Sequence, residues 1–399
     1  MGFVMKRVMV LGASYSLIPL IKTIKDMGMQ AIVTSIPGDY PGFTLADEVC
    51  YADITKPEEV LEYARKLNID AVATCCMDVG LKSLGYVNSE LGLCGPSANT
   101  VQLCTNKYLM KNAFVKEGVN TAKYVQIYCE EDLERAFQVL SFPLIIKAVD
   151  LMGSRGIFRC DTKEEVRSYY HETMSSTNLN YCILEEFLVG TMFGVEAMVQ
   201  NGKLTYFLPV SNELHKANPP FPIGHFAPWN KTEELYDKIQ KQIQLAVNAL
   251  GADNCPMDFD MMEKDGEIYI IEATARAGAT GMTDLVGIHY SINYFEAIVR
   301  CALGMDVSDL FAVSKEERKP ALTYLLESDK TGTLKEIQIE EIKDENIIDF
   351  SFNVEPGDEI RIMQNGRDRI GQIILTGESE AGCRTLLQDL LHSYTLEIV

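Results

Sequence analysis

MDFDMMEKDGEIYIIEATARAGATG, residues 257–281, predicts two strands joined by a tight turn at Lys264-Asp265-Gly266, with residues 267–271 as the returning strand. Asp260 lies in the first strand, and Glu272 directly follows the second. Because a short hairpin folds back on itself, residues separated by these twelve positions come to lie side by side. The sequence therefore predicts a pair of neighbouring carboxylates.

A metal–phosphate site is one interpretation of this carboxylate pair. Two carboxylates repel each other unless a cation lies between them, and hard oxygen ligands suit Mg²⁺ or Mn²⁺. Alternate residues of an extended strand share one face, so Thr274 and Arg276 face the same space as Glu272. The other interpretation is an edge hairpin whose acidic side chains are solvated, and this segment alone favours neither.

The amino-acid composition limits which classes of protein and of binding partner the chain can represent. A chain of 399 residues with 47% hydrophobic and 23% charged residues predicts a globular protein of two to four subdomains. The net charge of −21 argues against a nucleic-acid partner. Eleven cysteines without a C-x-x-C pair are typical of a reducing compartment, so we expect a cytoplasmic protein. No apolar run is long enough for a transmembrane helix, so we expect no membrane partner.

The first hundred residues alternate between strand and helix patterns, which predicts a parallel sheet with right-handed crossovers. The basic and apolar start imitates a signal peptide, but no small-x-small cleavage site follows, so residues 6–11 are interpreted as a buried strand. The expected strands are residues 7–11, 30–35 and 71–75, and the expected helices are residues 16–27, 58–67 and 83–91.

A nicotinamide oxidoreductase is a weak alternative for this N-terminal sheet. Gly12 is not followed by the second and third glycines of G-x-G-x-x-G, and the strand ending at Thr34-Ser35 lacks a ribose-binding acid. Asp78 follows the third strand at the edge where such sheets bind ligands. A role for Asp78 in a turn or as a helix N-cap is an equally good interpretation.

After Pro96 the pattern changes. Asn106 is a suitable N-cap for an amphipathic helix over residues 107–117. A strand over residues 142–149 then places Lys147 in an apolar run, where an amine needs an anion or water. The glycine-bounded loop Gly153-Ser154-Arg155-Gly156 can bring backbone N–H groups close to phosphate. The simpler alternatives are a hairpin turn for the loop and an edge position for Lys147.

Residues 181–190, YCILEEFLVG, predict a strand that runs into a connector and a glycine. A connector between two lobes can offer backbone groups to an adenine ring while apolar side chains enclose it. By itself this segment predicts only a strand and a turn.

The order of these motifs resembles the ATP-grasp superfamily over about residues 6–310. Within it the chain is most similar to the carboxylate–amine ligases and to the biotin carboxylase/carbamoyl-phosphate synthetase branch. The resemblance implies an α/β protein with α+β lobes: a parallel-sheet preATP-grasp domain at residues 1–104, a two-lobed ATP-grasp domain at 105–320 and a small α+β domain at 321–399. The N-lobe would be 105–184 and the C-lobe 185–320.

The resemblance also implies a role for each matching residue, with ATP and Mg²⁺ (or Mn²⁺) as cofactors. Arg276 and Lys147 would be catalytic, and Asp260, Glu272 and Thr274 would bind the metal. The residues implied to hold ATP are Lys107, Lys147, Gly153, Ser154, Arg155, Gly156, Glu185, Glu186, Phe187 and Leu188. Among these, the two lysines match those that reach the phosphates, and Glu185 and Leu188 match the positions that bind adenine.

Two positions depart from the family pattern. Thr274 stands where the third metal ligand is usually asparagine, and a hydroxyl is a weaker ligand than an amide carbonyl. Thr191-Met192 stands where many relatives have a ribose-binding glutamate, and Glu196 is a poor substitute because it is predicted to lie in a strand. An inactive ATP-binding regulatory protein of the same fold is therefore the alternative function.

The reaction implied is ligation of a carboxylate, in an amino acid or small peptide, to an amine through an acyl phosphate. Residues 211–229 are rich in proline and aromatic residues, and we interpret them either as a loop that lines the substrate pocket or as a packed surface loop. Lys216 and His225 are the candidate substrate contacts, together with Arg276. Only small-molecule partners are expected, with a homodimer as the assembly.

Overall fold

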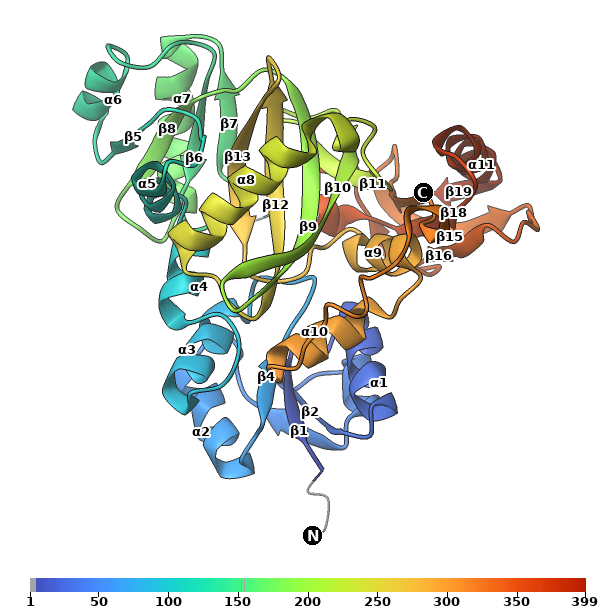
Figure 1. The fold of residues 1–399 in the computed structure, drawn as a ribbon. Helices are drawn as coiled ribbons and strands as arrows, with labels where there is room; N and C mark the ends of the chain where they lie inside the picture. Colours follow the sequence, from blue (N-terminus) through green and yellow to red (C-terminus); the bar gives the residue numbers. More distant parts are fainter. Residues whose placement is uncertain (1–4, 152, 154) are drawn as a thin grey trace.

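The computed structural model describes residues 5–151, 153 and 155–399. An N-terminal α/β unit lies below a central region of two sheets, and a C-terminal extension projects from one side (Figure 1). None of the helices in the described part of the chain combines the length and apolar character needed to cross a membrane.

The N-terminal sheet is parallel, as predicted, with strand order β3-β2-β1-β4. Side chains of its central strands alternate between two cores, one shared with α1 and one with α2 and α3, which cover its opposite faces. The elements are β1 (Arg7–Leu11), α1 (Ile18–Asp26), β2 (Gln30–Ser35), β3 (Glu48–Tyr51), α2 (Pro57–Leu67), β4 (Ala71–Ala73) and α3 (Leu81–Leu91).

Two details of this unit differ from the prediction. The edge strand β3 was missed because it has only four residues, of which just one, Cys50, is buried. The strand β4 ends at Ala73 rather than at residue 75, because Cys76 adopts a left-handed backbone conformation (φ +58°). The Cys76 N–H then donates to the Ala277 carbonyl at 3.0 Å, so the chain leaves the sheet to contact the segment that follows Arg276.

A second, antiparallel sheet of order β5-β8-β6-β7 forms the next lobe. As predicted, Asn106 caps α5, since its side chain accepts hydrogen bonds from the N–H groups of Tyr108 and Leu109. The elements are α4 (Ala98–Cys104), α5 (Lys107–Glu117), β5 (Tyr124–Ile127), α6 (Glu130–Ala136), β6 (Leu144–Ala148), β7 (Ile157–Cys160), α7 (Lys163–Ser176) and β8 (Cys182–Glu186).

The largest sheet has eight strands in the order β13-β12-β9-β10-β11-β14-β18-β16. Its first five strands and their helices are β9 (Thr191–Gln200), β10 (Lys203–His215), β11 (Phe221–Ala227), α8 (Thr232–Leu250), β12 (Cys255–Lys264), β13 (Glu267–Thr274), α9 (Met282–Tyr290) and α10 (Tyr294–Ala302). The strands added from the C-terminal part are β14 (Ala321–Leu326), β16 (Ile347–Phe352) and β18 (Gly371–Thr376). Because β14 pairs with β11, the expected boundary at 320/321 falls inside one continuous sheet.

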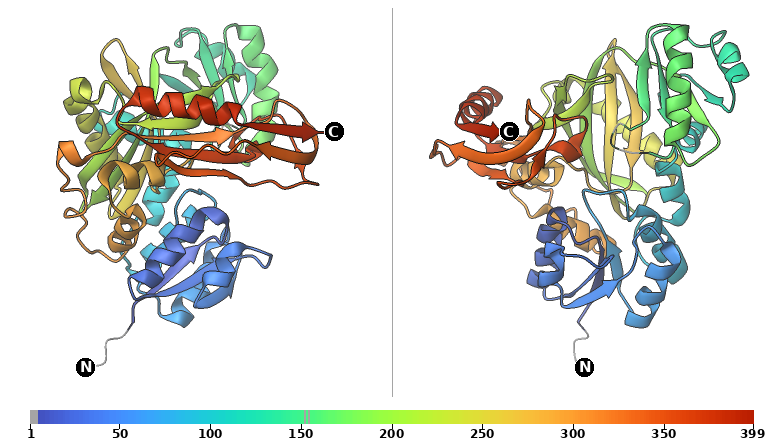
Figure 2. Two further views of the ribbon diagram at one scale, coloured as in Figure 1. Left: turned by 90° about the vertical axis from the view of Figure 1, so that its right-hand side faces the viewer. Right: turned by 180° about the vertical axis from the view of Figure 1, so that it is seen from behind.

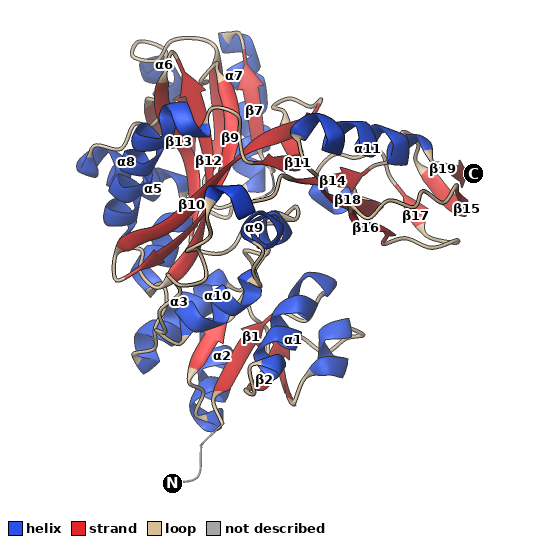
Figure 3. Ribbon diagram, turned by 45° about the vertical axis from the view of Figure 1, so that its right-hand side comes forward, coloured by secondary structure: helices blue, strands red, loops and turns tan. Residues whose placement is uncertain are grey.

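The rest of the C-terminal part is a small three-stranded sheet beside a helix. Its elements are β15 (Gly332–Ile339), β17 (Glu359–Ile360), α11 (Glu380–His392) and β19 (Tyr394–Ile398), and the strand order is β17-β15-β19. The helix α11 lies along these strands (Figure 2). Figure 3 shows this extension on the side of the large sheet opposite the β5–β8 lobe.

Residues 211–229 form a β-hairpin and not the predicted loop. The strand β10 continues to His215, and β11 begins at Phe221 after a short turn. The proline in β11, Pro222, stands opposite Leu214 where the register shifts, and a bulge tolerates a residue that cannot donate a ladder hydrogen bond. The prolines therefore did not exclude a strand here.

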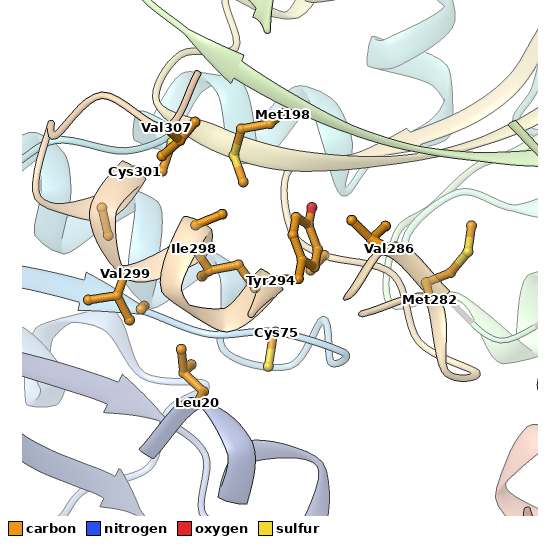
Figure 4. Packing of buried hydrophobic residues seen from close by; sticks show 14 of the residues in the cluster. Leu20, Cys75, Met198, Met282, Val286, Tyr294, Ile298, Val299, Cys301 and Val307 are labelled. Carbon is orange, nitrogen blue, oxygen red and sulfur yellow. The ribbon is translucent and has the colours of Figure 1, made fainter. Parts of the chain in front are cut away.

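One buried cluster joins the N-terminal unit to the large sheet. The helix α10 carries Tyr294 and Ile298 into it, Leu20 and Cys75 come from the N-terminal unit, and Met198 comes from β9 (Figure 4). Because all of these side chains are fully or almost fully buried, the two parts share a core. The loop after β4 is thereby held against the segment that follows β13.

Candidate active site

The hairpin β12–β13 places its acidic residues as predicted. Asp260 stands directly opposite Glu272, and Asp258 stands opposite Thr274. Directly opposed residues of an antiparallel pair share one face of the sheet. A cavity of about 100 Å³ opens on this face, and it is lined by Asp78, Gly153, Asp258, Asp260, Glu272, Thr274 and Arg276. The hairpin does form the edge of the large sheet, and its acidic side chains line this cavity.

Arg276 is buried between two carboxylates from different parts of the chain. Its Nε lies 2.7 Å from Asp78 Oδ1, and its Nη1 contacts Asp258 Oδ2. Burial alone would lower the pKa of Arg276, but the two carboxylates raise it well above its ordinary value. The guanidinium therefore stays charged, and the Asp78 side chain binds Arg276 instead of serving as an N-cap, a position that Gly80 occupies.

Negative charge is in excess around the cavity. Four carboxylates and one guanidinium line it, and one ammonium group, that of Lys107, lies 3.0 Å from Glu272 Oε1. Burial, followed by the charges of Asp258 and Glu272, raises the pKa of Asp260 to about 7. The carboxylates outnumber the two cationic groups, and a divalent cation placed among them would favour the ionised form of Asp260. Within the described residues no three carboxylate, histidine or cysteine side chains are already gathered as a metal site.

A third lysine, missed by the sequence reasoning, lies beside the two that were singled out. Lys111 is fully buried on α5, one helical turn after Lys107. Its Nζ lies 3.0 Å from Glu185 Oε2, and Lys147 Nζ lies 3.1 Å from the same oxygen. Residues four apart share one helix face, so the spacing of the two lysines could have identified it.

The glycine-bounded loop reaches the cavity. Gly153 lines it, and both Gly153 and Gly156 have positive φ (+67° and +63°) that a side chain would strain. The Gly156 carbonyl accepts a hydrogen bond from the Ala148 N–H at 2.8 Å, which ties the loop to β6. Arg155 also belongs to this loop, whereas Ser154 lies outside the described residues.

The connector after β8 has backbone N–H groups without a partner in the described part of the chain. The N–H groups of Glu186 and Phe187 are already bonded to the carbonyls of Lys123 and Pro143 at 2.9 and 2.8 Å. Among the described residues, the Leu188 N–H has no such backbone partner. The side chain of Glu185 is buried and bound to lysines, so it does not face solvent.

The acidic face continues across the large sheet as a row of polar side chains. Asn212, His225 and Thr323 stand opposite one another on β10, β11 and β14. Glu196 of β9 lies on the same face, opposite Asp258 on one side and Leu208 on the other. Gly194 stands opposite Asp260, and a Cβ there would approach Met282 of α9 to 3.2 Å. The missing side chain keeps space open between the acidic cavity and the polar row.

The side chain of Glu196 binds other protein groups. It is fully buried in β9, where it accepts hydrogen bonds from the Tyr294 hydroxyl at 2.6 Å and from the Gly278 N–H at 2.8 Å. Burial, followed by the charge of Asp258, raises its pKa well above the ordinary value. Glu196 therefore holds the segment that follows Arg276, and it lies in a strand as predicted.

The two candidate substrate residues of the 211–229 segment are separated by the fold. His225 lies on the polar face, with Nδ1 2.9 Å from Asn212 Oδ1. Lys216 lies exposed in the turn of the hairpin, outside the cavity lining. That turn instead contacts the other lobe, since Asn218 Nδ2 donates to the Arg159 carbonyl at 3.4 Å.

Stability is expected to fall in mild acid because of His225. Burial lowers its pKa from 6.5 to about 4, so between these values the unfolded chain binds a proton that the native chain does not. At pH 5 this difference removes about 2 kcal/mol of stability relative to pH 7.5. Urea unfolding of the wild type and His225→Gln at both pH values checks this, with the exposed His392→Gln as control. An equal pH dependence for all three proteins would contradict the assignment.

Two protein-family models match the chain. The model of the phosphoribosylglycinamide synthetase ATP-grasp (A) domain matches residues 105–279. The model of the L-amino acid ligase C-terminal domain 2 matches residues 324–399. The first match covers Lys107, the glycine loop and the acidic hairpin, so it contains most of the site.

Solved and curated proteins resemble the chain over nearly its whole length. Phosphoribosylglycinamide synthetase from Anaerococcus prevotii is 35% identical, with a TM-score of 0.84, and the match covers 99% of this chain and 100% of that one. L-amino acid ligase from Bacillus licheniformis has the same TM-score at 21% identity, covering 99% of both chains. Formate-dependent phosphoribosylglycinamide formyltransferase from Prochlorococcus marinus subsp. pastoris is 24% identical, over 82% of this chain and 83% of that protein.

The fold, the acidic cavity and these matches define a class of proteins, the ATP-dependent ligases that release ADP. The chain belongs to the ATP-grasp family. It is an enzyme that joins a carboxylate to an amine. The comparisons give no support to the alternative of an inactive regulatory relative.

Proposed function

We propose that the enzyme uses Mg²⁺ and ATP to phosphorylate the carboxylate of an amino acid or small peptide and then passes the acyl group to an amine. The observation that carries this proposal is the single cavity in which Glu272, Asp260 and Arg276 meet beneath Gly153 of the glycine loop. Phosphoryl transfer needs mainly positioning and neutralised charge, and Arg276, the nearby lysines and a metal ion held by the carboxylates would supply both.

The lysines and the arginine of the site would have different functions in phosphoryl transfer. Lys107, which reaches the cavity rim by its contact with Glu272, would neutralise phosphate oxygens together with Lys147. Arg276 would contact the oxygens on which charge develops, because a guanidinium makes two directed hydrogen bonds to phosphate or carboxylate. The γ-phosphoryl group moves to the substrate carboxylate with ADP leaving. The amine then attacks the acyl carbon, phosphate leaves, and the amine loses one proton.

The connector and the glycine loop would hold the nucleotide. The free N–H of Leu188 supports a hydrogen bond to adenine, as expected at this position of the family. Positive φ at Gly153 and Gly156 supports close approach of the loop backbone to phosphate, because no side chain stands in the way.

The donor set fits Mg²⁺. Asp260, Glu272 and Thr274 share one face and offer oxygen ligands, and a divalent cation would offset the excess of carboxylates around them. When bound, the ion would neutralise phosphate charge and orient the transferred group. Asp258 lies opposite Thr274, so an additional carboxylate stands beside the position where the hydroxyl is the weaker ligand.

The neutral polar row supports an amino acid or peptide as the carboxylate substrate. His225 is uncharged at neutral pH, and Asn212 Nδ2 is a buried donor without a partner among the described residues. The Asn212–His225 pair can therefore offer one donor and one acceptor to a polar substrate group. The matches to the L-amino acid ligase model and structure agree with this substrate class. A homodimer and a substrate contact by Lys216 stay predictions.

Binding of Mg-ATP is expected to stabilise the fold. At about 100 times its dissociation constant the nucleotide should add about 2.7 kcal/mol, visible as an upward thermal shift of a few degrees. NAD should give no shift, because the N-terminal sheet lacks the glycines of a dinucleotide site. The absence of a shift with Mg-ATP, Mn-ATP and Mg-ADP would contradict the proposed nucleotide site.

The substrates are tested by ADP release. Pairs of amino acids are offered with Mg-ATP, and the ligated product of each active pair is identified by its mass. We expect at least one pair to release ADP with formation of a condensed product. ADP release that needs no amine, or that yields no condensed product, would contradict the proposed ligation.

A further inference from the structure

Glu185 holds two buried lysines on a single oxygen. Lys111 Nζ lies 3.0 Å and Lys147 Nζ 3.1 Å from Glu185 Oε2, whereas Oε1 has no partner among the described residues. The exposed fraction of the Glu185 side chain is 2%, and those of Lys111 and Lys147 are 1% and 8%. Water is therefore excluded from all three charged groups, and each lysine competes for the same acceptor.

The surroundings of the two lysines differ. Lys111 Nζ also donates to Thr121 Oγ1 at 2.8 Å and to the Ala122 carbonyl at 3.5 Å, and it lies 5.4 Å from the centre of the Tyr124 ring. Lys111 is therefore satisfied by the protein itself. Lys147 Nζ has Glu185 as its one hydrogen-bond partner in the described part of the chain.

Lys147 is also placed next to a segment that can meet a ligand. It lies on β6 directly before Ala148, whose N–H donates to the Gly156 carbonyl at the end of the glycine loop. The lysine that can leave Glu185 is therefore the one on the strand to which the glycine loop is bonded, and the lysine that is fixed lies on α5.

We propose that Lys111 is a positioning residue, a permanent counter-ion that keeps Glu185 paired while Lys147 turns from this carboxylate to the phosphates of the nucleotide. The inference rests on the proposed nucleotide site. With Lys111 present, the departure of Lys147 leaves Glu185 still bound to one cation. Without Lys111, the same movement would leave a buried carboxylate unpaired, which is strongly unfavourable.

The pKa of Glu185 is consistent with Lys111 as the fixed counter-ion and Lys147 as the mobile one. Burial by itself raises the pKa of Glu185, but the charges of Lys111 and Lys147 more than reverse the effect, so its pKa is lowered. Glu185 is therefore ionised and needs a cation at all times. Burial lowers the pKa of Lys111 and the charge of Glu185 opposes this effect, so Lys111 and Glu185 favour each other's charged form whether or not nucleotide is bound.

The test measures ATP affinity by calorimetry in a set of variants. Lys111→Met is expected to weaken Mg-ATP binding about tenfold or more, because Lys147 is then held by Glu185 alone. Adding Glu185→Gln to Lys111→Met removes the carboxylate that retains Lys147. It keeps the backbone through which position 185 would bind adenine, so binding should return to within about threefold of the wild type. Lys116→Met, an exposed lysine of the same helix, is the matched control and should bind as the wild type does.

The outcomes separate this inference from the proposed function. If the wild type fails to bind Mg-ATP, the proposed nucleotide site is wrong. If the wild type binds and Lys111→Met binds equally well, Lys111 is not needed as a counter-ion. A double variant that is folded by circular dichroism but binds tenfold more weakly than the wild type would show that Lys111 only supports the structure. The double variant removes one positive and one negative charge, so the net charge of the three positions stays as in the wild type, and it decides the question even if Lys111→Met alone does not fold.

Discussion

Arg276→Lys is expected to lower kcat by about a hundredfold or more while ATP affinity stays within about threefold. The guanidinium uses Nε for Asp78 and Nη1 for Asp258, so it is fixed in one orientation at the cavity. A lysine has one ammonium group and cannot reproduce this fork or make two directed contacts to a phosphoryl group. The loss should therefore appear in the chemical step, and kcat/KM for the carboxylate should fall with kcat.

Steady-state kinetics and calorimetry on the same variant check this expectation. The matched control is Arg300→Lys, because Arg300 also pairs with two acids, Glu296 and Asp309, but is absent from the cavity lining. It should keep wild-type kcat. A purely structural role for Arg276 predicts instead a lower thermal stability with comparable losses in every kinetic parameter. Loss of ATP binding with kcat retained would remove Arg276 from the catalytic residues.

Glu272→Gln is expected to lower turnover by about a hundredfold or more, as for the loss of an electrostatic contact in the transition state. Glutamine keeps the size of the side chain but removes a charge that faces Asp260 and holds Lys107 at 3.0 Å. The required concentration of Mg²⁺ should rise at the same time. Thr274→Asn, which introduces the commoner ligand of the family, should preserve or raise Mg²⁺ affinity.

Turnover as a function of Mg²⁺ concentration measures both effects. Glu267→Gln is the control, since Glu267 begins the same strand but is exposed and pairs with Lys238. It should behave as the wild type does. Full ADP release by Glu272→Gln would mean that the carboxylate pair is only structural.

The local features of the site could be predicted because they depend on short stretches of chain. The turn at residues 264–266 brings the two strands together, and strand alternation directs Glu272, Thr274 and Arg276 to the same side. The direct pairing of Asp260 with Glu272 depends also on a register shift between Asp260 and Met261, which leaves Ile271 without a partner and which the sequence pattern did not predict. Asp258 could have been found by the same rule, because it lies two residues before Asp260 on one face. Asn106 caps its helix as predicted, since capping needs only adjacent residues.

Contacts between distant segments could not be predicted in this way. Asp78 meets Arg276 because α10 and its shared core hold the N-terminal unit against β13, and the two residues are 198 positions apart. Lys111 meets Glu185 through the packing of α5 on the β5–β8 lobe, 74 positions away along the chain. Residues 211–229 were predicted to be a loop because their prolines suggested turns, but the β10–β11 pairing absorbs Pro222 at a bulge.

The sequence by itself determined the class of chemistry: a hairpin that carries two carboxylates, an arginine in alternation with them, and the ordered lysines and glycines of an ATP-grasp enzyme. Tertiary structure alone decided which carboxylates hold Arg276, which lysine is fixed and which can move, and how the C-terminal strands extend the large sheet. The physical reason is how far apart along the chain the interacting residues lie. Periodicity and capping act between near neighbours, whereas burial, which sets the charge and the partners of each ionisable group, depends on the whole fold.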